Sequence, residues 1–240
     1  MQVEVITCMY NEEYLAPFFL AHYSWADKIT ILLDTATTDR TGEILCADLG
    51  VNIVPLLMLD GMDDGEKSRQ ISKTYRQSTS DWVIIADADE FIFLGKNDLA
   101  RVEDIYNVAA VALYNVYRHR TEGDIDPRWP IKEQRRHGVL DSRYIKPSIA
   151  RGGLEISWGP GHHEIEGTRN QYPTAFLGAH WANADSCFCV RRRIQGRRDR
   201  QSLTNYQFGW STHNQHITED DVLNECREHE IDPRIERFCV

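Results

Sequence analysis

The chain has 240 residues, of which 42% are hydrophobic and 27% charged, and its formal net charge is −10. This composition is typical of a globular protein, and no apolar run approaches the ~20 residues of a membrane-crossing helix. Because the six cysteines lack paired CxxC spacing and the N-terminal segment has neither a basic stretch nor an apolar signal core, we expect reduced thiols and a cytoplasmic location.

Strand-like and helix-like segments alternate through the first half of the chain. Asn11 is placed to cap the first helix, and Pro17 would kink that helix or delay its start. Pro55 marks the third strand as short or at a sheet edge. This alternation indicates an α/β domain with a mostly parallel central sheet flanked by helices. Strands are predicted at residues 3–10, 28–34, 52–58, 83–85 and 108–117, and helices after residue 11, before residue 50, at residues 65–78 and at residues 98–106.

The pattern loosens after residue 118. Residues 119–142 are rich in charge, proline and glycine, and they predict a long loop or lid. A helix over residues 218–230 begins with Thr218-x-x-Asp221, which is typical of a capping box. Short strands are predicted at residues 145–150, 154–158 and 174–181, and a helix at residues 185–198.

Charge divides the chain into acidic and basic parts. Residues 1–116 hold 8 Lys+Arg against 19 Asp+Glu, residues 117–200 hold 16 against 10, and residues 201–240 hold 3 against 8. The basic excess is densest in RRRIQGRRDR, residues 191–200. Such a run is either a solvated helix face or a site for a phosphate-bearing acceptor, an anionic glycan or an anionic membrane surface. Nucleic acid is not an expected partner, because no aromatic-rich basic platform accompanies the run.

The stretch DWVIIADADEF, residues 81–91, places carboxylates directly after a buried strand. If the strand continued, Asp87 and Asp89 would share one face within roughly 7 Å of each other, with Ala86 and Ala88 on the other face. We therefore expect a cation between the two carboxylates. Mg²⁺ or Mn²⁺ takes oxygen ligands and keeps positions open for phosphate oxygens, and the alternative is that the aspartates only begin a turn.

Two stretches carry a resemblance to a known family. The first is CMYNEEYLAPFFLAHYSWADKITILLDTATTDRTGEIL, residues 8–45, and the second is WVIIADADEF, residues 82–91. Together they resemble the nucleotide-sugar-dependent glycosyltransferases of GT-A fold, in particular the family 2-like group, whose Asp-x-Asp the second stretch matches. Farther on, IKPSIAR, GHHE and GAHW are similar to a subgroup of these enzymes.

The resemblance implies a GT-A, Rossmann-like fold with a C-terminal acceptor-binding region. Residues 1–117 would form a nucleotide-sugar-binding half and residues 118–240 an acceptor-binding, helical half of one compact domain. The implied enzyme uses Mn²⁺ or Mg²⁺ and moves a sugar from a nucleotide diphosphate sugar to the hydroxyl of a glycan, a lipid-linked molecule or another acceptor. Inversion at the sugar is the usual outcome in this family.

The resemblance also implies roles near the nucleotide. Tyr10, Asn11 and Glu12 would line the floor, Asp34 would lie beside the base, and Arg69 would approach the nucleotide from the helix before the Asp-x-Asp. Many family members have a second aspartate after the position of Asp34, where this chain has a threonine. Lys67 is a further candidate for phosphate contact at the start of the same helix, although exposed lysines are common on helices.

The metal and the catalytic base have their own candidates. Asp87 and Asp89 would contact the ribose and the metal, and His180 in GAHW would complete the metal shell. His163 and Glu164, in the glycine-flanked GPGHHE, are candidates for the base that deprotonates the acceptor hydroxyl, with a structural role as the alternative. Reserve candidates are Asp141 for the base, and Trp158, Trp181 and Trp210 for stacking on sugar rings or for core packing.

Two other functions fit parts of the sequence. A nucleotidyltransferase also needs carboxylates and Mg²⁺, but it usually has a glycine- and lysine-rich phosphate loop near the first strand, and CMYNEEY contains no glycine. A non-catalytic nucleotide- or glycan-binding protein of the same fold would keep the site without turnover. The two intact aspartates argue against this second alternative.

Overall fold

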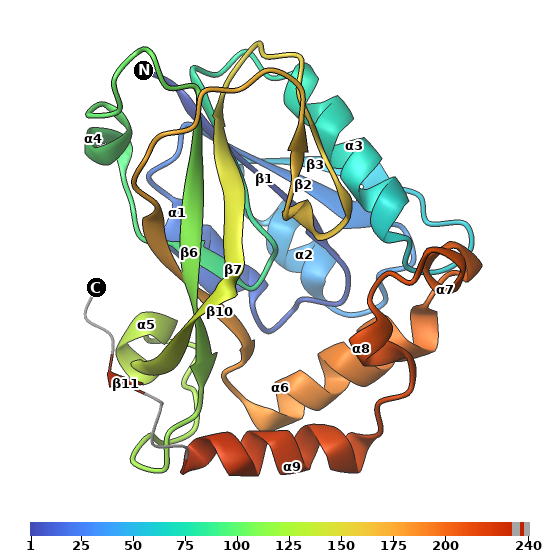
Figure 1. The fold of residues 1–240 in the computed structure, drawn as a ribbon. Coiled ribbons are helices and arrows are strands. Elements are labelled where there is room, and N and C mark those ends of the chain that lie inside the picture. Colours follow the sequence, from blue (N-terminus) through green and yellow to red (C-terminus); the bar gives the residue numbers. More distant parts are fainter. Residues whose placement is uncertain (232–235, 238–240) are drawn as a thin grey trace.

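One large sheet forms the centre of the molecule. In the computed structural model, which describes residues 1–231 and 236–237, nine strands pair in the order β3-β2-β1-β4-β7-β6-β10-β5, with β11 paired to β7. The side chains of residues 141–144 are outside this description. Helices flank the sheet, and a group of C-terminal helices lies below it in Figure 1. The α/β architecture predicted from the sequence is confirmed.

Four parallel strands build the first part of the sheet. β1 (Val3–Met9) lies between β2 (Lys28–Asp34) and β4 (Trp82–Ile85), and β3 (Val51–Leu56) forms the outer edge. β4 is a continuous apolar run, and β1 is buried along nearly its whole length, because both faces of these strands are covered. Pro55 lies in the edge strand β3, as predicted, where its missing N–H interrupts no interior ladder.

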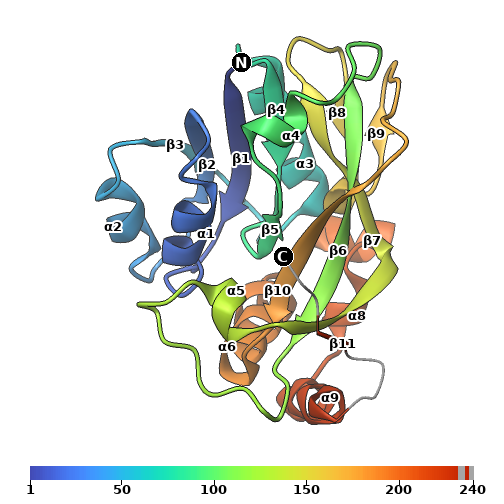
Figure 2. The same ribbon diagram turned by 90° about the vertical axis from the view of Figure 1, so that its left-hand side faces the viewer.

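Helices cover the two faces of these strands. α1 (Ala16–Tyr23) and α2 (Thr41–Cys46) pack on one face, and α3 (Asp64–Arg76) packs on the other (Figure 2). Successive strand residues point to opposite faces, so Val5 packs in the cluster that contains α1 and Ile6 in the cluster that contains α3. The carboxyl ends of the strands are thereby fixed from both sides.

The second part of the sheet is mixed. β7 (His137–Arg151) pairs antiparallel with both β4 and β6 (Val108–Tyr117), β10 (Phe176–Asn183) is parallel to β6, and β5 (Glu90–Ile92) is antiparallel to β10. The prediction of a mostly parallel sheet therefore holds for the first four strands and is corrected for the rest. The reason is β7, which returns between β4 and β6 and takes up part of the predicted loop. Strands from both predicted halves share this sheet, and the boundary at residue 117 stays a prediction.

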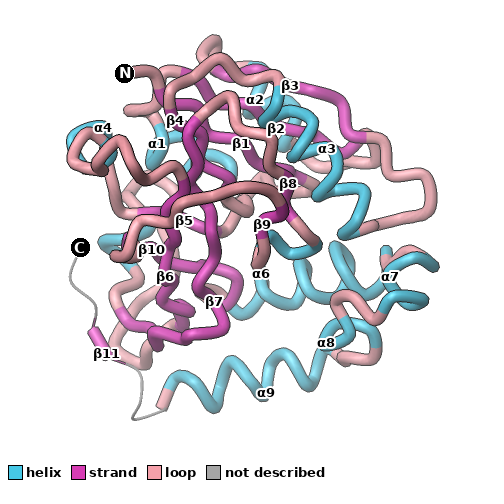
Figure 3. Tube along the Cα trace, turned by 45° about the horizontal axis from the view of Figure 1, so that its top comes forward, coloured by secondary structure: helices cyan, strands magenta, loops and turns pink. Residues whose placement is uncertain are grey.

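The C-terminal part is helical and follows the sheet's last long strand. α6 (Ser186–Arg191) continues into the π-helix η2 (Arg192–Arg197) and the 3-10 turn η3 (Arg198–Arg200), where one helix had been predicted. α6 lies beside α9 (Glu219–Glu230) at one end of the sheet (Figure 3). The remaining elements are α4 (Lys96–Leu99), α5 (Ile131–Gln134), β8 (Ser157–Trp158), η1 (Pro160–His162), β9 (Ile165–Glu166), α7 (Leu203–Phe208), α8 (Thr212–Gln215) and β11 (Glu236–Arg237).

Two helix starts test the predicted capping residues. α1 begins at Ala16 with Pro17 in its first turn, so the late start is confirmed and the predicted cap at Asn11 is wrong. Thr218 caps α9 and forms the predicted capping box with Asp221. Among the helices that the structure describes, none is long and apolar enough to span a bilayer.

Candidate active site

The side chains that follow β4 face a cavity of about 690 Å³. Its sheet side is lined by Asp87 and Asp89 after β4, Asn115 in β6, Lys146 in β7 and His180 in β10. Its other side is lined by residues of η2, of α8 and of the segment that joins α7 to α8. The cavity therefore lies between the sheet and the C-terminal helices.

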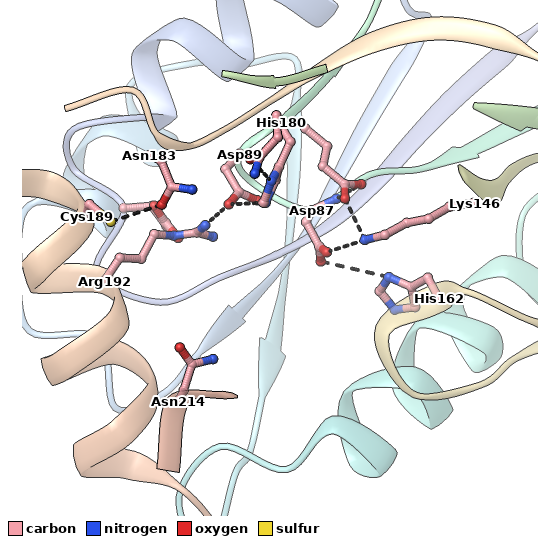
Figure 4. A network of polar contacts seen from close by, with 12 residues as sticks. Asp87, Asp89, Lys146, His162, His180, Asn183, Cys189, Arg192 and Asn214 are labelled. Carbon is pink, nitrogen blue, oxygen red and sulfur yellow. Dashed lines mark hydrogen bonds and ion pairs between the residues drawn. The ribbon is translucent and has the colours of Figure 1, made fainter. Parts of the chain in front are cut away.

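Asp87 and Asp89 belong to a tight turn rather than to a continued strand. β4 ends at Ile85, and the N–H of Glu90 donates to the carbonyl of Asp87 at 2.9 Å. The predicted division of faces nevertheless holds, because Ala86 and Ala88 are buried in the apolar core while both aspartates line the cavity. The turn gives the two carboxylates different neighbours (Figure 4).

Two lysines neutralise Asp87. Lys67 Nζ lies 2.5 Å from Asp87 Oδ1, and Lys146 Nζ lies 3.2 Å from Asp87 Oδ2 and 2.5 Å from Glu90 Oε1. Burial alone would raise the pKa of Asp87, but the two lysines outweigh it and hold that pKa well below its usual range. Burial would lower the pKa of Lys146, and the two carboxylates raise it above its usual value. The cation expected beside Asp87 is thus supplied by the protein.

His162 is the third neighbour of Asp87. Its Nδ1 lies 3.8 Å from Asp87 Oδ1, its side chain is buried, and no described residue forms a hydrogen bond with its Nε2. Burial lowers the pKa of His162 to about 3, against the opposing effect of Asp87. The ring is therefore neutral at pH 7, and it adds no charge to the cluster.

Asp89 has a different set of partners, from β10 and η2. Arg192 donates from Nη1 to Asp89 Oδ2, and His180 Nε2 lies 3.1 Å from the same oxygen. Arg192 also donates from Nε to Glu12 Oε1 at 2.8 Å. Asp89 Oδ1 and Glu12 Oε2 are buried carboxylate oxygens without a hydrogen-bond partner among the described residues. Buried polar atoms are normally satisfied, so each of these oxygens can accept from a donor or contact a cation.

His180 faces an oxygen on each side of its ring. Its Nδ1 lies 3.1 Å from Asn115 Oδ1, and Asn115 in turn donates from Nδ2 to the Tyr117 hydroxyl at 2.5 Å. Burial lowers the pKa of His180 to about 4, so at pH 7 the ring carries a single N–H. If that proton lies on Nδ1 and is donated to Asn115, the lone pair of Nε2 faces Asp89. A nitrogen lone pair and a carboxylate oxygen repel each other at this distance, and a metal cation bound to both would remove the repulsion.

A second cavity of about 80 Å³ adjoins the first, because Lys67, Arg192 and Arg197 line both. It is lined on the sheet side by Tyr10 and Asp34, at the ends of β1 and β2, and by the predicted nucleotide-site residue Glu12. In this cavity Asp34 Oδ2 accepts from Arg200 at 2.7 Å, and the Arg200 guanidinium lies 3.5 Å from the centre of the Tyr10 ring.

The structure separates two other predicted residues from this cavity. Asn11 accepts from the N–H of Thr38 at 2.8 Å and so orders the turn after β2, and it lines neither cavity. The side chain of Arg69 is 70% exposed, pairs with Glu66 and lines neither cavity, so its contact with the nucleotide stays a prediction. Residues two apart on an α-helix point in nearly opposite directions, so Lys67 faces the site and Arg69 faces solvent.

The loop that contains η1 brings in one of the two candidate bases. His163 lines the large cavity, and partial burial lowers its pKa, so the ring is neutral at pH 7. Glu164 is exposed and is not among the lining residues, while its carbonyl accepts from the N–H of Gly159 at 3.0 Å. Asp141 lies in β7 where side chains are outside the described part of the chain.

The three tryptophan candidates divide between core and cavity. Trp158 and Trp181 are buried in the apolar clusters, so the core-packing alternative holds for both. Trp210 lines the large cavity and packs closely on Gly65 of α3, where an added Cβ would lie 2.7 Å from the ring. The indole of Trp210 can form one wall of the cavity because glycine at position 65 leaves room for the ring.

Several site residues were not predicted individually. Lys146 lies within the apolar strand stretch IKPSIA, and a lysine in such a run is itself a signal of a buried ion pair. The arginines at positions 192, 197 and 200 were noted only as parts of a basic run, and nothing in the sequence told which side chains of that run face inward. Within the described residues, no group of three or more His, Cys, Asp or Glu side chains is arranged to hold a metal.

Comparisons with known proteins find similarity to solved structures but not to any family model or curated sequence. No protein-family model and no curated protein matches the chain. The solved structure of S. aureus TarS is 13% identical with a TM-score of 0.46, and the alignment covers 97% of this chain and 44% of TarS. TarS 1-349 in complex with UDP-GlcNAc is 15% identical with a TM-score of 0.45, over 97% of this chain and 74% of that one.

A third structure is similar over a shorter part. Glucosyl-3-phosphoglycerate synthase from Mycobacterium tuberculosis in complex with UDP is 18% identical with a TM-score of 0.34, over 50% of this chain and 45% of that chain. The alignment with TarS extends over nearly the whole of this chain. This chain spans less than half of the length of TarS.

Proposed function

We propose that this protein is a metal-dependent glycosyltransferase, which moves a sugar from a nucleotide diphosphate sugar to the hydroxyl of a glycan, a lipid-linked molecule or another acceptor. The observation that supports it best is the pair of Asp89 and His180 at the cavity. The neutral His180 ring lies between two oxygens, and Asp89 keeps a buried oxygen without a partner. Both features fit a divalent cation at this position.

Asp89 and His180 are the residues that would hold Mn²⁺ or Mg²⁺. Two protein ligands suffice for such a cation when substrate phosphate oxygens and waters complete its shell. When bound, the cation would neutralise charge that develops on the departing diphosphate. The predicted metal role of Asp87 stays a prediction, since its oxygens already pair with Lys67 and Lys146.

The small cavity is the proposed position of the nucleoside. The Tyr10 ring offers a face for stacking, and Asp34 can accept a hydrogen bond from an N–H or O–H of the nucleoside. Arg200 now covers both groups, so it has to exchange these contacts for contacts with the ligand. The sugar and the acceptor would then share the large cavity, with Trp210 as an apolar wall.

His163 is the proposed base for an inverting transfer. Its ring lines the large cavity, and its lowered pKa keeps it unprotonated and able to accept the proton of the acceptor hydroxyl. Glu164 could take this role only if the loop after β8 moved, because its side chain does not line the cavity. This assignment requires that His163→Ala lower transfer more than it lowers donor binding.

A thermal-shift screen tests the proposal. ADP, CDP, GDP, UDP and their common sugar conjugates are each added with and without Mn²⁺, because a ligand that binds the folded form raises its apparent stability. We expect stabilisation by one nucleoside diphosphate, strictly dependent on Mn²⁺, and slow release of that diphosphate from its sugar conjugate. Equal stabilisation with and without Mn²⁺ would contradict the proposed metal site. Pyrophosphate release from a nucleoside triphosphate, or binding without turnover of any donor, would instead favour one of the two alternative functions.

A further inference from the structure

The basic run of residues 191–200 lines the interior of the site as well as the surface. η2 carries three arginines that line the large cavity, and two of these also line the small one. Buried Ile194 anchors η2, since it packs with Cys189 of α6 and Val222 of α9. A π-helix inside a longer helical run is frequently found at functional sites.

Among the residues that the structure describes, one cation of the large cavity has no ion-pair partner. Four of its five lysine and arginine side chains pair with carboxylates: three of them with the aspartates and glutamates already described, and Arg193 with Glu225 at 2.6 Å. Arg197 makes no ion pair and no side-chain hydrogen bond with any residue that the structure describes. The five cations are Lys67, Lys146, Arg192, Arg193 and Arg197.

The position of Arg197 is at the boundary of the two cavities. It lines the small cavity together with Tyr10 and Asp34, and it lines the large cavity together with Asp87 and Asp89. A nucleotide sugar that spans both cavities has to pass its diphosphate through this boundary. Lys67 and Arg192 lie there as well, but Asp87, Asp89 and Glu12 already neutralise them.

We infer that Arg197 binds the diphosphate of the donor and stabilises it as it leaves, an inference that depends on the proposed function. A guanidinium is always charged and matches two phosphate oxygens with parallel N–H donors. Glu12 lies close enough for the charge of Arg197 to oppose the rise in its pKa that burial causes, but no described carboxylate forms an ion pair with Arg197, so its N–H donors are available to the ligand. Arg197 lies between the proposed nucleoside site and the proposed sugar site, which is where the diphosphate of a nucleotide sugar would lie. The diphosphate would therefore supply the anionic partner that Arg197 lacks among the described residues.

Calorimetric titration of Arg197→Gln with the nucleoside diphosphate found in the thermal-shift screen tests this inference. We expect at least about tenfold weaker binding of the diphosphate, which is the usual loss of a charge-assisted hydrogen bond, and less than twofold weaker binding of the corresponding nucleoside. Arg197→Lys should fall between the two, since it keeps the charge and loses the paired donors. The matched control is Arg191→Gln, because Arg191 is an exposed member of the same run that lines neither cavity.

Three outcomes would overturn the assignment while leaving the proposed function in place. Unchanged affinity for the diphosphate in Arg197→Gln, or an equal loss for diphosphate and nucleoside, removes the phosphate contact. Weaker binding of glycerol 3-phosphate with unchanged binding of the diphosphate would assign Arg197 to a phosphate-bearing acceptor instead. If the unmodified protein bound no nucleoside diphosphate at all, both the assignment of Arg197 and the proposed function would fail. The other three outcomes contradict only the assignment of Arg197. Unchanged melting temperatures of the variants show that folding is not the cause.

Discussion

The β1–β4 region and the C-terminal region from α6 to α9 contribute opposite charges to one site, and they are held in place differently. The strands are buried on both faces within two large apolar clusters. The C-terminal helices share a small buried cluster of Cys189, Ile194 and Val222, and ion pairs such as Arg192 with Asp89 tie them to the sheet. The carboxylates are therefore fixed by packing, whereas the arginines are fixed by contacts that a charged ligand can replace.

This difference leads to different expected effects of substitutions. A carboxylate at the end of a buried strand cannot move to compensate for a change in its charge. An arginine on η2 or η3 can exchange a carboxylate for a phosphate without disturbing the core, because long side chains reorient easily. Loss of a carboxylate should thus affect the chemistry, and loss of an arginine should affect mainly ligand binding.

The largest effect is expected for Asp89→Asn, which removes the charge at the proposed cation site and keeps the side-chain volume. Sugar transfer and donor hydrolysis should fall by about 10³-fold, at the upper end of what loss of one preorganised electrostatic contact causes. Donor binding should also lose its dependence on Mn²⁺. Rates are measured with the donor identified in the screen, and circular dichroism checks that the fold is intact. Activity close to that of the unmodified protein would exclude Asp89 from the site chemistry.

Lys146→Ala should produce the largest loss of stability. The lysine is buried and pairs with Asp87 and Glu90, so its removal leaves two buried carboxylates with fewer cations. We expect the free energy of unfolding to fall by about 3–5 kcal/mol in chemical denaturation. The matched control is Lys96→Ala, whose exposed pair with Asp27 should contribute less than about 1 kcal/mol. Equal effects of the two substitutions would mean that the buried cluster is not held by this lysine.

The same comparison explains which features could be predicted from the sequence. β6 has the predicted bounds at residues 108–117, and Thr218 caps α9 as predicted, because both depend on local patterns of apolar and capping residues. The position of Asp87 and Asp89 at a strand end was also predictable, since an apolar run that stops at carboxylates is a local signal.

The partners of the two aspartates were not predictable in this way. Arg192 and Asp89 are 103 residues apart, and Lys146 and Asp87 are 59 apart, so no short-range pattern links them. The sequence analysis could therefore name a metal as a counter-charge but could not name Lys146 or Arg192 as partners of the aspartates. Only residues 145–150 of β7 were predicted as a strand, because its first half and its place in the sheet depend on pairing with β4 and β6, both distant in the chain.

A smaller effect is expected from pH, through buried His162. The unfolded chain binds a proton near the usual His pKa of 6.5, whereas the folded protein, with the pKa of His162 lowered to about 3, does not. Between these values the unfolded state holds more protons, so the free energy of unfolding falls as the pH is lowered and is fully restored above pH 6.5. For this histidine the loss from pH 7.5 to 4.5 should be about 2–3 kcal/mol.

His162→Asn is the variant that isolates this contribution. His162 has a φ of 61°, in the left-handed region that asparagine tolerates better than most residues. Urea unfolding at pH 7.5, 6.5, 5.5 and 4.5 should show a shallower decline in the variant than in the unmodified protein. Parallel declines would mean that other groups, such as the buried carboxylates, cause the acid sensitivity.

The smallest effect is expected at Arg69, and it sharpens the comparison within a single helix. Arg69→Gln should change the free energy of unfolding and the donor affinity by less than about 0.5 kcal/mol, because the side chain is exposed and pairs only with Glu66. Lys67→Gln, two residues earlier, should lower the free energy of unfolding by about 1 kcal/mol, since Asp87 loses a cation in a largely buried setting. Both are measured by urea unfolding and calorimetric titration. A larger effect at Arg69 than at Lys67 would reverse the inferred orientation of α3 and return Arg69 to the nucleotide site.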